Sequence, residues 1–434
     1  MAPADREIWR LALPALGALV AQPLFVMIDA AIVGTLGTEP LAGLGAASTV
    51  ATTVVGLCIF LAYATTSDVA RLVGSGDKRA ALSQGIDGMG LGILLGIPLG
   101  VALWFSAEPL SRALGTSDAV TPYSVAYLQV ISWALPALLG VLAGVGVLRG
   151  LQDTRATLLV TLAQVALNLA LCLLFVLILG WGITGSAAAT GLAELLGLLA
   201  YGWLVLRRAQ RAGVRLAPSG AGVMKAARDG VPLFVRTVAL RIVFVLAVAV
   251  AARLGDAELA SYHVTATLFF TLALALDALA IAGQALIGRT LGADDVSSTR
   301  DVTNRLVRWS LILGVVLAVV VLVLRPWLPH WFSSDPSVLD LIASALLVLA
   351  LLQPLAGIVF ALDGILIGAG DTRWLAVAQL VMMLAFLPAA WWVLTVQGSL
   401  ASLWWALGWF LLVRGALLGW RARGSAWMVT GAVR

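Results

Sequence analysis

Twelve long apolar stretches follow one another along the chain, and they constrain its fold more than any other feature. A helix needs ~20 mostly apolar residues to cross a bilayer. The stretches cover residues 8–34, 41–72, 82–106, 120–148, 156–180, 184–207, 227–254, 259–291, 302–325, 337–369, 374–397 and 399–421. Only 11% of the residues are charged and 61% are hydrophobic, so the chain has too little polar surface to face water on all sides. We therefore expect an all-α integral membrane protein with twelve transmembrane helices.

A repeated motif divides these stretches into two groups of six. The sequence LRGLQDTR at 148–155 recurs as LIGAGDTR at 366–373, an offset of 218 residues. The same offset relates Pro14 to Pro232, Gly74 to Gly292 and Pro136 to Pro354. Because six is even, both groups enter the membrane in the same orientation. This pattern predicts two parallel six-helix repeats around a central cleft, a geometry suited to alternating access.

The connections are short except for one basic segment between the two repeats. We assign residues 1–207 to an N-terminal six-helix bundle and 208–226 to a cytoplasmic linker. Residues 227–421 then form a C-terminal six-helix bundle, and 422–434 form a cytoplasmic tail.

Basic residues fix the expected orientation. Most of them, together with those of both tails, among which we count Arg414, fall on one side of the predicted helices. The opposite side holds only Arg112, Arg253 and Arg325. Because basic residues gather in cytoplasmic loops, both termini are expected in the cytoplasm of a multi-pass protein of the cell membrane.

Several function classes are disfavoured by the composition. Cys58 and Cys172 lie inside apolar stretches, which argues against a disulfide framework or a metal site. The formal charge of +5 is too small and too scattered to indicate nucleic-acid binding. No glycine-rich phosphate loop is present, so neither ATP nor another cofactor is expected. A membrane-embedded enzyme remains an alternative, although the two histidines, His263 and His330, both fall near the outer side.

Three segments together resemble a known transporter family. They are the paired DTR motifs, ALDALAIAGQALIGRTLGADD at 275–295 and IDAAIVGTLG at 28–37. In order and spacing the chain resembles the multidrug and toxic compound extrusion (MATE) family, most closely its DinF-type branch, over residues 8–421. The resemblance implies a membrane exporter, not an enzyme, that exchanges H⁺ or Na⁺ for amphipathic, often cationic small molecules. A lipid-linked precursor flippase is the alternative within transport, but such proteins line the cleft with several basic residues.

Asp29 is the acidic residue that most needs an explanation. A carboxylate at the centre of a membrane helix costs ~2.5–3.5 kcal/mol on insertion scales. The resemblance implies that Asp29 binds the coupling cation, joined by Asn168 and Thr190. A second aspartate of the family's cluster is replaced here by Cys172, which favours H⁺ over a tightly held Na⁺ because a thiol is a poor ligand for hard cations. The alternatives are a polar residue reaching the outer loop for Asp29, and helix–helix hydrogen bonds for the other two.

Two further carboxylates, Asp277 and Asp363, lie inside predicted helices of the second repeat. Their counterparts in the first repeat, Ile59 and Val145, are apolar, so the repeated scaffold does not demand acids there. The resemblance implies that Asp277 and Asp363 belong to a substrate cavity that attracts cations. The alternative is that they form buried ion pairs with neighbouring arginines.

The residues expected around these two acids are only partly those of the family. Gln284 stands where the family pattern has a glutamate, and Arg236 fits the DinF-type branch; both are assigned to the same substrate cavity as the two acids. Arg241 is the second arginine available for the ion-pair alternative. Glu194 faces either the bundle or the lipid headgroups.

Pro14 and Pro23 lie in the approach to Asp29. Proline removes a backbone donor and kinks a helix. The first helix is therefore a candidate hinge that bends when Asp29 changes protonation, with a static kink as the alternative.

Overall fold

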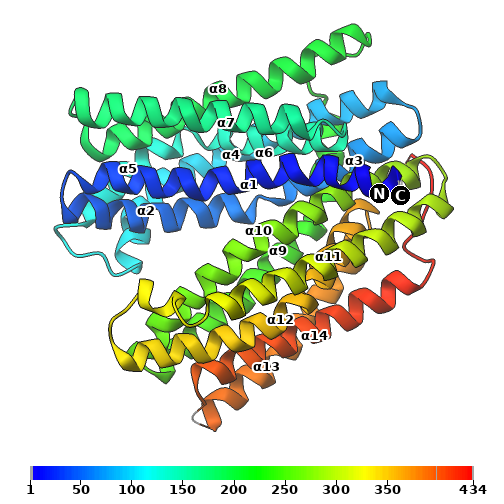
Figure 1. The fold of residues 1–434 in the computed structure, drawn as a ribbon. Coiled ribbons are helices and arrows are strands. Elements are labelled where there is room, and N and C mark those ends of the chain that lie inside the picture. The colour runs from blue at the N-terminus through cyan, green and yellow to red at the C-terminus, as the bar shows by residue number, and fades with distance from the viewer. Residues whose placement is uncertain (1–2, 397, 433–434) are drawn as a thin grey trace. The chain divides into compact units, whose positions relative to one another are not determined.

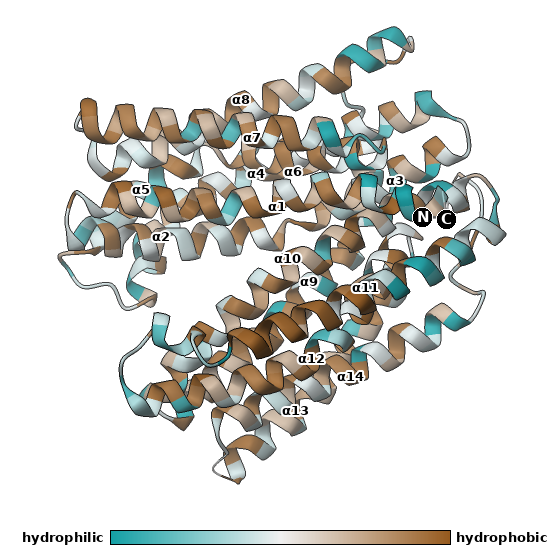
Figure 2. Cartoon of the chain, viewed as in Figure 1, coloured by the Kyte–Doolittle hydropathy of each residue, from teal (hydrophilic) through white to brown (hydrophobic). Residues whose placement is uncertain are grey.

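The computed structural model describes residues 3–396 and 398–432, and all regular secondary structure in them is helical. Eleven helices are long and apolar enough to cross a membrane. The twelfth span is a pair of helices bent by 57°, α5 (Thr121–Ser132) and α6 (Leu135–Gly150). The predicted fold class is therefore confirmed. Hydrophilic residues gather toward the helix ends (Figure 2), as expected for a protein whose middle faces lipid.

Each half of the chain contributes six spans. In the first half, the helices α2 and α3 together form one span, as do α5 and α6. The first half holds α1 (Pro3–Gly34), α2 (Thr38–Leu57), α3 (Phe60–Gly74), α4 (Lys78–Ala113), α5, α6, α7 (Thr154–Cys172), the π-helical turn η1 (Leu173–Ile178) and α8 (Gly182–Arg211). The second half holds α9 (Gly220–Leu254), α10 (Asp256–Gly292), α11 (Val296–Leu324), the short 3₁₀ helix η2 (Leu328–Trp331), α12 (Pro336–Gly368), α13 (Thr372–Thr395) and α14 (Leu400–Arg423). Figure 1 shows these elements in chain order.

The chain divides by its contacts into two compact units whose boundary differs from that of the sequence repeats. The N-terminal unit comprises residues 13–234, and the C-terminal unit comprises residues 3–12 together with 235–432. Helix α1 therefore belongs to both. Its first turns are held in the C-terminal unit by ion pairs, in which Glu7 accepts from Arg289 at 2.8 Å and Asp5 from Arg305 at 3.2 Å.

The segment 208–226, predicted as the linker between the two bundles, is bound to the N-terminal unit. Asp87 of α4 is 2% exposed, and both of its carboxylate oxygens accept hydrogen bonds from this segment. Arg215 Nη2 donates to Oδ2 at 2.5 Å, and the Ser219 backbone N–H donates to Oδ1 at 2.8 Å. A buried carboxylate with two donors stabilises the segment far more than an exposed ion pair does.

The sequence repeat is also visible in the packing of the helices, where equivalent glycines make equivalent close contacts. Gly146 of α6 lies so close to α3 that an added Cβ would be 2.6 Å from the Ala62 carbonyl oxygen. At the same offset of 218 residues, a Cβ on Gly364 of α12 would be 2.5 Å from the Ala280 carbonyl oxygen of α10. Small residues let membrane helices approach closely. The same kind of backbone contact therefore occurs once within each unit.

The first prediction concerns this contact. Gly364→Val is expected to lower the free energy of unfolding by about 1–3 kcal/mol, because backbone atoms of α10 must move to make room. The check is the thermal unfolding midpoint of the purified protein in detergent. Gly202→Val is the matched control, since Gly202 is also helical and nothing lies within 4 Å of its added Cβ. Equal midpoints for the two variants would contradict the prediction.

Candidate functional site

Asp29 lies on α1 in the N-terminal unit and is 5% exposed. Two neutral groups donate hydrogen bonds to the same carboxylate oxygen, Oδ1. They are the Ser186 hydroxyl of α8 at 2.7 Å and the Cys172 thiol of α7 at 3.1 Å. Among the described residues, Oδ2 has no hydrogen-bond partner. The carboxylate is thus oriented by neutral donors, and one oxygen remains available to carry a proton.

Asn168 and Thr190 form a second level of the same cluster, one helical turn from Cys172 and Ser186. The Asn168 side-chain amide donates to the Thr190 hydroxyl at 3.3 Å. Residues four apart share a face of a helix, so α7 and α8 each present two polar groups to the same side. The Asn168 side-chain oxygen is buried and accepts no hydrogen bond from any described residue. A buried acceptor without a donor is costly, and it is ready to receive a proton donor.

The cluster also contains residues that the sequence did not single out. Ser186 stands four residues before Thr190, and that spacing was the available signal. Tyr127 of α5 is buried, and its phenol interacts with the Thr190 hydroxyl. The position of Cys172 was recognised as a departure from the family, and its thiol is a direct partner of Asp29.

Asp363 of α12 lies in the C-terminal unit between two arginines. It pairs with Arg236 of α9 and, at 3.2 Å, with Arg414 of α14. The three side chains are 13%, 5% and 7% exposed. Arg414 was assigned from the sequence to the cytoplasmic tail, which is wrong, because α14 continues to Arg423 and buries this side chain. These contacts are the ones that the ion-pair alternative requires.

The other predicted residues of this region differ in their exposure. Arg241, expected as a possible partner of the acids, is exposed. Asp277 is half-buried on α10. Gln284 is 2% exposed, its backbone touches Gly368 of α12, and its side-chain oxygen accepts no hydrogen bond in the described part of the chain. Gln284 thus lies at the close contact between helices α10 and α12.

The two predicted hinge prolines lie within one helix. Helix α1 runs from Pro3 to Gly34 through both Pro14 and Pro23. Pro14 stands two residues after the boundary between the two units, which falls after Ala12. Glu194 faces α7, where its carboxylate accepts from Gln164 Nε2 at 2.9 Å.

The profile of the MatE family matches the chain twice, over residues 14–174 and 232–392. Both matches begin and end at the offset that relates the repeated motifs, and together they cover more than half of the chain. The chain belongs to the MatE family. Its relatives include proteins named as multidrug resistance proteins, and this MatE protein is a multi-pass membrane transporter.

Known MatE proteins resemble this one over nearly its whole length. "Protein DETOXIFICATION 43" of Arabidopsis thaliana is 28% identical, over 94% of this chain and 88% of its own length. "DNA damage-inducible protein F" of Escherichia coli is 28% identical, over 98% of this chain and 94% of its own, in keeping with the DinF-type resemblance. The solved structure "Crystal structure of MATE in the bent conformation" has a TM-score of 0.89 at 21% identity, covering 98% of this chain and 96% of that one.

The repeated DTR motif has a structural role in this MatE protein. The Asp153 side chain accepts from the Ala156 backbone N–H at 3.1 Å, which caps α7, and it also pairs with Arg208 near the end of α8. In the second repeat, Asp371 precedes α13 and pairs with Arg421 of α14 at 2.7 Å. Each motif aspartate therefore ties the fifth span of its repeat to the sixth.

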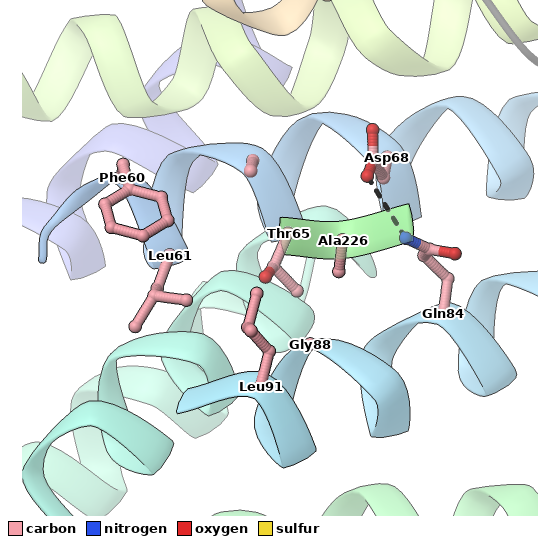
Figure 3. Close-up of a pocket in the computed structure, with 9 residues that line it drawn as sticks. Phe60, Leu61, Thr65, Asp68, Gln84, Gly88, Leu91 and Ala226 are labelled. Atoms are coloured by element: carbon pink, nitrogen blue, oxygen red, sulfur yellow. Dashed lines mark hydrogen bonds between the residues drawn. The ribbon is translucent and has the colours of Figure 1, made fainter. Parts of the chain in front are cut away.

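A further acid of the MatE protein, Asp68, borders a small cavity between α3, α4 and α9 (Figure 3). Its carboxylate accepts from Gln84 Nε2 at 3.3 Å, and the Thr65 side chain lines the same space. The cavity measures about 10 Å³, enough for one water molecule. The signal for it in the sequence is that Asp68 is the single acid within the apolar stretch 41–72.

Proposed function

We propose that this MatE protein is a proton-coupled antiporter of the cell membrane that exports amphipathic, often cationic small molecules by alternating access, with both termini in the cytoplasm. The observation that carries the proposal is the surroundings of Asp29. It is a buried carboxylate whose two hydrogen bonds, from Ser186 and Cys172, come from neutral donors.

The chemistry of these donors favours H⁺ over Na⁺ as the coupling ion. A hard cation needs several oxygen ligands turned toward it. The Ser186 hydroxyl points its hydrogen at Asp29, and a thiol occupies the place of the family's second aspartate. A proton needs only one free carboxylate oxygen, and Oδ2 provides it.

Protonation then links the ion gradient to the state of the N-terminal unit. A proton taken up on Oδ2 from outside removes the charge that makes burial of Asp29 costly. Helix α1 then bends at Pro14 and Pro23 and repacks, which displaces the substrate outward. Release of the proton to the cytoplasm restores the charged carboxylate and the state that binds substrate.

The second prediction tests the coupling ion. The full-length protein is reconstituted into vesicles, and transport of a fluorescent cationic dye is followed while H⁺ and Na⁺ gradients are imposed separately. We expect the H⁺ gradient alone to drive transport. Transport that needs Na⁺ and ignores the H⁺ gradient would overturn the proposal.

One substitution makes this test sharper. Cys172→Asp places a second carboxylate beside Asp29, and we expect it to add a response to Na⁺. Cys172→Ser is the matched control, because it keeps a neutral donor to Asp29 and should remain driven by H⁺ alone. If both variants gain a Na⁺ response, loss of the thiol is enough to admit Na⁺, and a second carboxylate is not what determines the coupling ion.

A further inference from the structure

A pocket of about 330 Å³ lies at one end of the C-terminal unit, where α11 ends, η2 follows and α12 begins. This connection is the yellow segment of Figure 1. Most of the lining is apolar and consists of leucine, proline and alanine side chains, but three polar side chains border it as well: Arg325, His330 and Asp340. Its size is that of a small-ligand site.

Arg325 and Asp340 carry opposite charges on the same pocket without neutralising each other. Neither forms an ion pair with any residue that the structure describes. Arg325 is held in place by its Nε, which donates to the Ala343 carbonyl oxygen at 2.7 Å. The remainder of the guanidinium group is free to bind an anion. Asp340 is exposed and has no donor among the described residues.

The surface beside the pocket has the character of a membrane interface. Trp327 is 59% exposed and Trp331 is 71% exposed, and both adjoin the pocket in sequence. The last turns of α11 expose Leu322 and Val323. Tryptophans gather where the bilayer meets water, and aliphatic side chains face the acyl chains. The pocket therefore lies at the depth of the lipid headgroups.

We propose that this pocket binds the headgroup of a zwitterionic phospholipid, phosphatidylethanolamine. Arg325 binds the phosphate through its planar fork of donors, helped by His330. Asp340 accepts hydrogen bonds from the primary ammonium group. The apolar lining receives the glycerol and the first carbons of the chains. A lipid with a phosphate but no amine would satisfy Arg325 and leave Asp340 unpaired.

The test compares retention of two lipids that differ only in the headgroup. The full-length protein is delipidated in detergent and offered phosphatidylethanolamine or phosphatidylglycerol with identical acyl chains, and bound lipid is counted by native mass spectrometry. Asp340→Asn is expected to weaken phosphatidylethanolamine binding about tenfold and to leave phosphatidylglycerol unchanged. Arg325→Gln should weaken both about tenfold, since it removes the charge-assisted hydrogen bonds to the phosphate that both lipids carry.

Asp118→Asn and Arg253→Gln are the matched controls, because both residues are exposed and lie at other helix ends. Unchanged phosphatidylglycerol binding by Asp340→Asn also shows that this variant is folded. Equal affinity of the wild-type protein for both lipids, or a loss in Asp340→Asn no greater than in Asp118→Asn, would overturn the proposal. Displacement of the lipid by millimolar phosphoethanolamine would overturn the assignment to a lipid in favour of a soluble ligand.

Discussion

Asp29→Asn is expected to abolish export driven by a proton gradient while the protein still folds and inserts. The amide oxygen of asparagine can accept the same two hydrogen bonds, from Ser186 and Cys172, that Oδ1 accepts now. Burial becomes cheaper because no charge is present. The variant resembles the protonated state permanently. The proton gradient therefore cannot change the charge at this position.

The measurement is dye transport by Asp29→Asn in reconstituted vesicles, normalised to the amount of inserted protein. We expect transport at the background level at every imposed pH difference. Asp68→Asn is the matched control, since it also removes an acid from the membrane helices of the N-terminal unit, and it should retain transport. Wild-type export by Asp29→Asn would mean that this carboxylate takes no part in coupling.

Asp363→Asn is expected to destabilise the protein more than any other single amide substitution considered for the C-terminal unit. It leaves Arg236 and Arg414 side by side without the carboxylate that separates their charges. Removing one partner of a buried ion pair costs about 3–5 kcal/mol. The thermal unfolding midpoint should fall accordingly, and a second change, Arg236→Gln, should recover part of the loss because it removes one of the two unbalanced charges.

The control is Asp229→Asn, which breaks the half-exposed pair of Lys225 and Asp229. Such surface pairs contribute about 0–1 kcal/mol. The same preparations also test whether Asp363 attracts substrate, by comparing the binding of cationic and neutral dyes. An unchanged midpoint with a selective loss of cationic-dye binding would favour the substrate role over the ion-pair role.

The fold was largely predictable from the sequence because the length and apolarity of a span are one-dimensional properties. All twelve spans and the repeat of 218 residues were recognised in that way. Partners in the candidate site were harder to predict, since they depend on how helices rotate about their axes. Ser186 and Tyr127 carry polar groups that are common in membrane helices, so nothing in the chain marks them before α5 and α8 are placed beside Asp29.

Arg414 shows the same limit. Its pairing with Asp363 joins residues about fifty positions apart, and its place near the C-terminal end of an apolar stretch made it look like a tail residue. The close contacts of Gly146 and Gly364 were also invisible, because a missing side chain leaves no pattern of its own.

The glycine contact that recurs in each of the two units has a consequence for how a duplicated protein diversifies. The glycines at such contacts, Gly146 against α3 and Gly364 against α10, cannot be replaced by larger residues, because any side chain would collide with the backbone of the neighbouring helix. Functional side chains are under no such restraint: the counterpart of Asp29 is Ala247, and that of Asp363 is Val145. Duplication has therefore let each copy specialise, one holding the acid expected to carry the proton and the other the charged triad. A symmetric dimer engineered from two identical halves would keep the frame of the transporter and lack one of these two specialisations.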